Sequence, residues 1–395
     1  MNVPHRHKLV LPIFMLWGCT LESANVQEFA LGGQHSCALL GDGSVKCWGF
    51  RGGGAVGDGK PLGHGFPDIQ TSAVSVQGLG ARATQITAGW NWSCALLETG
   101  AVKCWGTPVG GAISDLPDPA MAGRPTTVPG LEANVQAISG QFITACALKT
   151  DGSVWCWGEN NLQWVEPKGW QKAPVLISFP LPARLIATGS TDLCTVLLDN
   201  SIWCSSSEGP ARLLQLPNVE WQALAVGGNY ACALAPGGAL YCWNGAPPLK
   251  KSHYDDSSIL LMELDAPVAQ MGLGWSHACA IFEGPSSGQP IDPLRGNLGG
   301  TLGGRMRCWG YGVAGVLGAS IATRRTCADD NEACVSDTPV APVGLGDVKR
   351  IGAGYARTCA EQTDGQVFCW GDNLTGALGN GNRWDSFTPT RVHGL

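Results

Sequence analysis

The sequence predicts an all-β fold: a seven-bladed β-propeller closed by pairing of the N- and C-terminal segments in one blade. Two observations carry this prediction. Cysteine pairs with matching flanks recur seven times along the chain, and each pair brackets a hairpin-like segment. The two chain ends, placed one after the other, also reproduce a segment that lies between two of these units. We expect the propeller over residues 25–395, after a signal peptide over 1–18 and a short tether over 19–24.

The segment before the repeats has the features of an export signal. Residues 5–8 supply positive charge, and residues 9–17 form an apolar stretch too short to cross a membrane. Residues 16–19 read Leu-Trp-Gly-Cys, which resembles the lipobox of bacterial lipoproteins. The resemblance implies cleavage before Cys19, a lipid on its sulfur and attachment to the outer membrane. The alternative is an ordinary secreted protein in which Cys19 is unpaired.

The cysteine spacing predicts structural disulfides. The chain has 17 cysteines, an unusual number for a protein of a reducing compartment. Without Cys19 they form six pairs ten positions apart, one pair 29 positions apart and one local pair: Cys37 and Cys47, Cys94 and Cys104, Cys146 and Cys156, Cys194 and Cys204, Cys232 and Cys242, Cys359 and Cys369, Cys279 and Cys308, and Cys327 and Cys334. Zinc sites bring cysteines only a few residues apart, twice over. The spacing therefore favours disulfides over metal binding.

Each ten-residue pair encloses a predicted β-hairpin. Residues 37–49 read Cys-Ala-Leu-Leu-Gly-Asp-Gly-Ser-Val-Lys-Cys-Trp-Gly, and nearly the same pattern recurs over 146–158. Two short apolar runs around an Asp-Gly turn are typical of a hairpin. Folding about Asp42 places Cys37 opposite Cys47, and facing residues on antiparallel strands have Cα atoms about 4.5–5.5 Å apart. The Cα atoms of a disulfide are usually about 4.4–6.8 Å apart, so each pair is predicted to form a disulfide across its own hairpin.

The number of units and the chain ends predict a closed ring. Seven units correspond to about 54 residues each, which lies in the range of propeller and solenoid repeats. Residues 389–395 followed by 22–29 reproduce residues 125–138 almost letter for letter. The break therefore falls inside one repeat, and we expect both termini in one blade, which removes exposed sheet edges. Two insertions, over 282–305 and 319–339, enlarge the sixth unit.

The repeat resembles that of a known family. The pattern Gly-x-x-His-Ser-x-Ala-Leu occurs at residues 32–39, Trp-Gly at 48–49 and 370–371, and Gly-x-Leu-Gly at 376–379. This pattern is similar to the repeat of the regulator-of-chromosome-condensation family, whose members are seven-bladed β-propellers. The fourth copy departs from it, because Ser205 follows Cys204 where other copies have Trp-Gly. The paired cysteines imply an extracytoplasmic variant.

Composition and motifs argue against several function classes. A net charge of −6 and a pI near 5.6 disfavour binding to nucleic-acid phosphates. Residues 310–315 match Gly-x-Gly-x-x-Gly, but they follow Cys-Trp within a repeat and no helix is predicted after them. The sequence predicts no enzyme, no cofactor and no metal. One cluster allows a calcium site or a solvated loop: Asp329, Asp330, Asn331 and Glu332.

Positions that vary among the repeats suggest a binding face. Six copies have Gly five places before the first cysteine, whereas the positions four and two places before it vary and often hold aromatic or charged residues. The candidates are Trp90, Trp92, Phe142, Tyr230, Trp275, His277, Tyr355 and Arg357. Aromatic residues and Arg are enriched at protein interfaces. The alternative is that they fill the central channel or pack between blades.

Together these patterns predict a non-catalytic, monomeric, protein-binding scaffold at the bacterial cell envelope. Its partner is unknown, and its membrane contact is through the lipid alone. Two alternatives stay open. The same face would suit a carbohydrate that is bound or hydrolysed there. Family resemblance by itself implies guanine-nucleotide exchange on a small GTPase.

Overall fold

The structure is a computed structural model of the chain. It describes residues 25–60, 68–107, 123–160, 169–190, 192–206, 209–228, 230–243, 260–262, 264, 266–283, 305–319 and 335–395. The fold is nearly all β, and its helical content in these ranges consists of short 3-10 turns such as η1 (Gly52–Gly54), η3 (Pro236–Gly238) and η4 (Val313–Gly315). Within the described part of the chain, no helix has the length and apolar character needed to cross a membrane.

The strands form seven four-stranded antiparallel sheets. Blade 1 comprises β1 (Val26–Leu31), β2 (His35–Leu40), β3 (Val45–Phe50) and β4 (Ile69–Ser75). Blade 2 comprises β5 (Ala83–Ala88), β6 (Trp92–Leu97), β7 (Val102–Gly106) and β8 (Thr126–Thr127). Blade 3 comprises β9 (Val135–Gln141), β10 (Thr144–Lys149), β11 (Val154–Asn160) and β12 (Gly169–Ile177). Blade 4 comprises β13 (Ala183–Thr188), β14 (Asp192–Leu197), β15 (Ile202–Ser206) and β16 (Gly209–Leu213).

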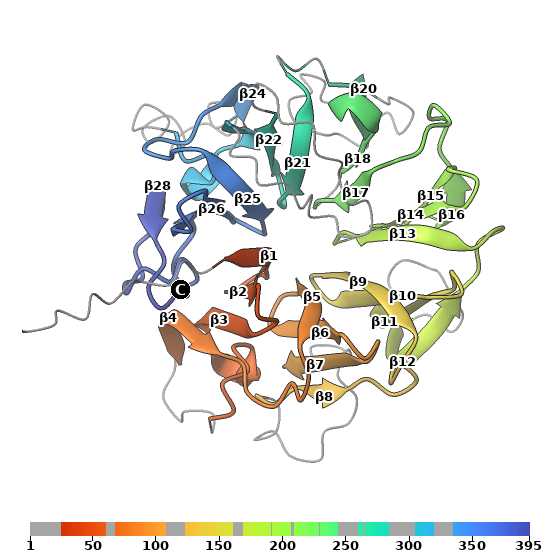
Figure 1. Ribbon diagram of the computed structural model, residues 1–395, viewed down its shortest axis with the longest axis horizontal. Coiled ribbons are helices and arrows are strands. Elements are labelled where there is room, and N and C mark those ends of the chain that lie inside the picture. The colour runs from red at the N-terminus through yellow and green to blue at the C-terminus, as the bar shows by residue number, and fades with distance from the viewer. Residues whose placement is uncertain are drawn as a thin grey trace, which may run out of the picture.

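The remaining three blades repeat this plan. Blade 5 comprises β17 (Ala223–Val226), β18 (Ala231–Leu234), β19 (Leu240–Trp243) and β20 (Leu260–Leu261). Blade 6 comprises β21 (Val268–Leu273), β22 (His277–Phe282), β23 (Met306–Tyr311) and β24 (Val335–Val340). Blade 7 comprises β25 (Val348–Ala353), β26 (Arg357–Gln362), β27 (Val367–Gly371) and β28 (Ser386–Arg391). The sheets stand around a central axis with the first strand of each blade innermost (Figure 1). The predicted seven-bladed propeller is confirmed.

The predicted mode of closure is wrong. Strand β1 pairs with β2 in blade 1, and β28 pairs with β27 in blade 7, so the two termini lie in different sheets. The reason is that residues 125–138, which the joined ends resemble, lead from the outer strand of blade 2 to the inner strand of blade 3. The sequence repeat therefore spans the junction between two blades, and the chain is broken at such a junction.

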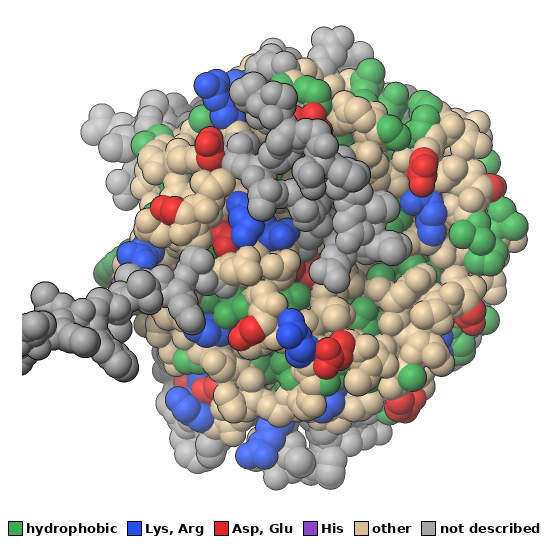
Figure 2. All heavy atoms as spheres, in the orientation of Figure 1, with side chains coloured by type: hydrophobic (Ala, Val, Ile, Leu, Met, Phe, Trp, Pro, Cys, Tyr) green, Lys and Arg blue, Asp and Glu red, His purple; other side chains and the backbone are tan. Residues whose placement is uncertain are grey.

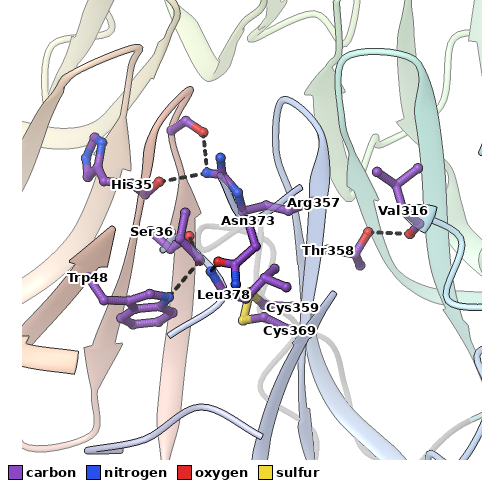
Figure 3. The surroundings of a disulfide bond; sticks show 12 residues. His35, Ser36, Trp48, Val316, Arg357, Thr358, Cys359, Cys369, Asn373 and Leu378 are labelled. Atoms are coloured by element: carbon purple, nitrogen blue, oxygen red, sulfur yellow. Dashed lines mark hydrogen bonds between the residues drawn. A yellow bond between two sulfur atoms is a disulfide. The ribbon is translucent and has the colours of Figure 1, made fainter. Parts of the chain in front are cut away.

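Contacts across the seam between blades 7 and 1 close the ring instead. The Val26 amide donates to Oε1 of the buried Glu361 at 2.9 Å. At the rim, the Ala73 amide donates to the His393 carbonyl at 2.8 Å, which places the C-terminus beside β4 (Figure 1). Nε1 of Trp48 in blade 1 also donates to the Ala377 carbonyl of blade 7 at 2.8 Å (Figure 3).

Seven disulfides connect β2 to β3 or their equivalents in every blade. The partners are directly opposite in the strand register, as the hairpin geometry predicted, with Cα–Cα distances of 4.0–4.1 Å. The bonds are Cys37–Cys47, Cys94–Cys104, Cys146–Cys156, Cys194–Cys204, Cys232–Cys242, Cys279–Cys308 and Cys359–Cys369.

Two cysteine predictions fall on other parts of the chain. The predicted disulfide between Cys327 and Cys334 is not among these seven bonds, because Cys327 and Cys334 both lie outside the described residues. Cys19, the predicted site of the lipid, lies outside them as well. The eighth disulfide and the lipid therefore stay predictions from the sequence.

The recurrent tryptophans pack each blade onto its neighbour's disulfide. In blade 7, Cys359 and Cys369 share a buried cluster with Trp48 of blade 1 (Figure 3). Five other disulfides lie in a cluster with the tryptophan of the next blade: Trp105, Trp157, Trp243, Trp309 and Trp370. The disulfide of blade 3 instead packs on Leu193 and Leu197 of blade 4, whose sequence has no such tryptophan. The recurrent tryptophans are therefore core residues.

Candidate binding face

The antiparallel strands give the disc two distinct faces. Each innermost strand begins at one face and ends at the other, where a short loop leads to the second strand. We call the face with these short loops, such as residues 32–34 and 89–91, the lid face. The opposite face has the turns between second and third strands, such as residues 41–44 and 198–201, and we call it the turn face.

Four aromatic rings meet at the centre of the lid face. They stand four places before the first cysteine in blades 2, 3, 6 and 7, and they are Trp90, Phe142, Trp275 and Tyr355. The ring centroids are 5.3 Å apart for Trp90 and Phe142, and 5.0 Å apart for Trp90 and Tyr355. Trp275 completes the circuit at 6.1 Å from Phe142 and 5.0 Å from Tyr355. We call these four residues the aromatic lid.

Small residues in the other three blades make room for the lid. The equivalent positions are Gly33, Ser190 and Gly228. A Cβ on Gly33 would lie 2.6 Å from the Trp90 ring, and one on Gly228 would lie 2.2 Å from the Trp275 carbonyl oxygen. Both distances are too short for any side chain. The small residues of blades 1, 4 and 5 therefore leave room at the mouth for the four rings of blades 2, 3, 6 and 7.

The lid covers one end of the central channel. The seven innermost strands line a cavity of about 270 Å³, whose polar lining includes Glu28, Gln85 and Arg184. Between the rings and the adjoining loops, the space is only about 10 Å³, enough for one water molecule. The side chains of the lid remain partly exposed, and that of Tyr355 is 36% exposed. The lid thus offers a surface of aromatic rings rather than a deep pocket.

The structure corrects the prediction for the other four candidates. Trp92, Tyr230, His277 and Arg357 are buried, with at most 2% of each residue exposed, and do not lie on the surface of the lid face. Residues two apart on a strand share a side of the sheet. The position two places before the cysteine therefore points with the disulfide toward the next blade.

These buried side chains bond to the neighbouring blade. Nε1 of Trp92 donates to the Phe142 carbonyl at 3.0 Å, and the Tyr230 hydroxyl donates to the His277 carbonyl. Nε2 of His277 lies 2.9 Å from Oγ1 of Thr358 in blade 7. The side chains two places before the first cysteine thus make contacts between blades, in agreement with the alternative interpretation of the sequence pattern.

Arg357 makes the largest set of these contacts, at the seam between blades 7 and 1. Its Nη1 donates to the carbonyls of Gly32 and His35 at 2.9 and 3.1 Å, and its Nη2 donates to that of Gly33 at 2.8 Å (Figure 3). Burial lowers the pKa of Arg357 to about 10, while the negative charge of Asp372, 3.8 Å away, acts in the opposite direction. The guanidinium is therefore charged at neutral pH.

Two buried histidines are neutral at the same pH. Burial lowers the pKa of His35 to about 3, with a further contribution from the positive charge of Arg357. Burial also lowers the pKa of His277 to about 4. Nε2 of His35 lies 2.6 Å from Oγ of Ser93 in blade 2. Both imidazoles thus act as neutral hydrogen-bonding groups between blades.

Two exposed apolar residues of blade 7 were not among the candidates from the sequence. Trp384 is 80% exposed and Leu374 is 65% exposed, and both lie in the loop between β27 and β28. The fully buried Asn373 fixes this loop, because its Nδ2 donates to the Trp384 carbonyl at 3.0 Å and its Oδ1 accepts from the Leu378 amide. Residues 376–379 of this loop belong to the repeat pattern, and Trp384 occurs in it once. The sequence therefore gave no reason to single out Trp384 as a binding residue.

The other candidate motifs lie in structural surroundings. Residues 310–315 form the end of β23 and the turn η4, in agreement with their interpretation as repeat glycines. Among the described residues, no cluster of three or more His, Cys, Asp and Glu side chains could hold a metal ion. The acidic cluster at 329–332 lies outside these residues, as does most of each insertion. Acidic and basic side chains are interspersed on the face shown in Figure 2.

The fold and the repeated inter-blade contacts define a disulfide-bonded, seven-bladed propeller. Family models described as the regulator of chromosome condensation (RCC1) repeat match residues 26–50, 83–108, 144–162 and 364–395. The chain belongs to the RCC1-repeat propeller family, as its repeat pattern predicted.

Known proteins resemble this chain over most of its length. It is 22% identical over 387 residues to a secretion-regulating guanine nucleotide exchange factor of Bos taurus, covering 95% of this chain and 72% of that protein. The crystal structure of human WBSCR16 superposes with a TM-score of 0.67 at 18% identity, covering 88% of this chain and 93% of the other. The CRINKLY WD40 ectodomain of the Arabidopsis thaliana receptor kinase ACR4 gives 0.54 at 18% identity, covering 92% and 98%. Likeness at these identities shows the shared fold.

Proposed function

We propose that this chain is a non-catalytic, protein-binding propeller of the bacterial cell envelope, held there by a lipid on Cys19. Its aromatic lid is the surface that takes up the partner. The observation that carries the proposal is the meeting of Trp90, Phe142, Trp275 and Tyr355 at one mouth of the ring. Each comes from a different blade, and each remains partly exposed.

The chemistry of the lid favours a protein partner. Aromatic side chains provide large contact areas with few rotatable bonds, and they dominate the binding energy of many protein interfaces. The edge contacts within the lid hold its rings in place before a partner arrives, which reduces the entropy lost on binding. Trp384 and Leu374, on the loop between β27 and β28, add two exposed apolar side chains at the lid face.

The disulfides support an oxidising compartment. Seven bonds, one in each blade, require conditions that the bacterial cytosol does not provide. The export signal and the lipobox-like residues 16–19 agree with a location outside that compartment.

Two other functions each have one observation in their favour. Aromatic rings at a surface also stack on sugars, so a glycan is the second candidate ligand of the lid. Similarity to the bovine exchange factor over 387 residues favours nucleotide exchange on a GTPase. Against exchange, a cytosolic GTPase and a chain with seven disulfides would occupy different compartments.

The test is partner capture by lid variants. The mature domain is used to isolate partners from envelope extract, and Trp275→Ala is compared with Leu198→Ala. Leu198 is 62% exposed on the turn face and serves as a matched control. We expect Trp275→Ala to lose at least tenfold in capture at an unchanged unfolding temperature, and Leu198→Ala to lose none.

Three results would contradict the proposal. Equal capture by both variants would remove the lid as the binding surface. Binding of a glycan array by the wild type, lost in Trp275→Ala, would replace the protein by a carbohydrate. Acceleration of nucleotide release from a GTPase would favour the exchange factor.

A further inference from the structure

The described chain starts at the turn face, near the seam between blades 7 and 1. Strand β1 runs from Val26 at the turn face to Leu31 at the lid face. Asn25, just before it, is fixed at the turn face: its carbonyl accepts from the Gly41 amide at 2.9 Å, and its Oδ1 accepts from Nζ of Lys349 at 3.0 Å. Any attachment through the preceding residues therefore acts on the turn face.

The distance from this point to the predicted lipid is short. Six residue steps separate Cys19 from Asn25, and an extended chain spans at most about 3.6 Å per residue, or ~20 Å in all. The six residues of β1 also span ~20 Å, since a strand rises about 3.3 Å per residue. If the lid faced the bilayer, the tether would have to pass the full thickness of the disc as well as its radius, which six residues cannot do.

We infer that the protein lies on the outer membrane with its turn face toward the bilayer and the aromatic lid directed away from it. This orientation rests on the proposed lipid on Cys19, and the occupant of the turn face is a phospholipid surface. The partner of the lid then approaches from the side opposite the membrane. The bilayer leaves no room for a large partner at the turn face.

Apolar side chains on the turn face suit this contact. Leu198 is 62% exposed and Leu181 is 43% exposed. They are neighbours, because the Leu198 amide donates to the Pro182 carbonyl at 3.0 Å. Two leucines are a weak attachment by themselves. The lipid supplies the attachment, and the leucines lie at the surface that it brings to the membrane.

Energy transfer from each face to the bilayer tests the orientation. The full chain is produced in a bacterium that acylates lipoproteins, with azidophenylalanine in place of Leu198 on the turn face or Leu374 on the lid face. These positions are matched in exposure, at 62% and 65%. Each is coupled to a donor dye, and the protein is reconstituted in vesicles of phosphatidylethanolamine and phosphatidylglycerol that contain an acceptor lipid. We expect severalfold greater transfer from position 198 than from position 374.

The outcomes separate this inference from the proposed function. Equal transfer from both positions, or greater transfer from position 374, with Cys19 acylated would overturn the orientation and leave partner binding intact. A mass spectrum that shows Cys19 without lipid would overturn the anchor and the orientation together. The Cys19→Ala chain serves as the control and should give no transfer. Strong transfer from it would show that a different feature attaches the protein, and this too would overturn the inference.

Discussion

Replacing Arg357 by Met should loosen the seam that closes the ring. The substitution removes three hydrogen bonds from a charged donor to the carbonyls of Gly32, Gly33 and His35, over 2.8–3.1 Å. Bonds to charged groups contribute about 1.5–3 kcal/mol each, and a buried polar group left without a partner costs about 1–3 kcal/mol. The variant no longer pays the desolvation cost of a buried charged guanidinium, and this offsets part of the loss. We expect a net loss of about 3–5 kcal/mol.

Urea unfolding followed by tryptophan fluorescence, with the disulfides kept oxidised, measures this loss. The matched control is Arg82→Met, because Nη2 of Arg82 also donates to a carbonyl, that of Gly41, but at an exposed site. The control should lose no more than about 0.5 kcal/mol. Small-angle scattering should also show an expanded disc for Arg357→Met. A loss below about 1 kcal/mol would refute the assignment of Arg357 as the main contact of the seam.

Further predictions concern acid, the disulfides and close packing. Stability should fall by about 4 kcal/mol between pH 6.5 and 4.5, measured by urea unfolding, because unfolded His35 and His277 take up protons at an ordinary pKa while the buried imidazoles do not. The change should be about half as large in His277→Gln. Joint replacement of Cys37 and Cys47 by Ser should cost about 3 kcal/mol in the same assay, and no loss would show that the bond does not form. Gly354→Ala should cost about 1–3 kcal/mol and lower the unfolding temperature, because its methyl would lie 2.6 Å from a backbone oxygen of blade 1.

The sequence was sufficient for the fold because the repeat is redundant. The ten-residue spacing of Cys37 and Cys47, with its Asp-Gly turn, determines a hairpin and its register, and seven copies agree. The mode of closure was misjudged because the resemblance of the chain ends to an internal segment shows where a repeat is broken. It does not show whether that segment lies within one sheet or joins two, as residues 125–138 do.

Half of the candidate residues for the binding face lie at the surface, and the other half are buried. Trp90 and Trp92 differ only in position, yet Trp90 lies in the lid and Trp92 is buried against blade 3. Both stand an even number of places before Cys94, so strand alternation does not separate them. The difference is that β6 begins at Trp92, whose side chain points with the disulfide toward the next blade, whereas Trp90 lies in the loop before the strand. Trp384 was beyond sequence reasoning, because its exposure depends on the turn that Asn373 holds through contacts within the loop.

Because each blade is one uninterrupted stretch of chain with its own disulfide, the protein suits synthesis across a membrane. During export, a blade can complete its four strands and oxidise its two thiols before the next one emerges. No early strand has to wait for a late one to share its sheet. The last step in maturation would then be the docking of blade 7 against blade 1. A chain stalled before that step would expose the carbonyls of Gly32 and Gly33, which accept from Arg357 in the closed ring.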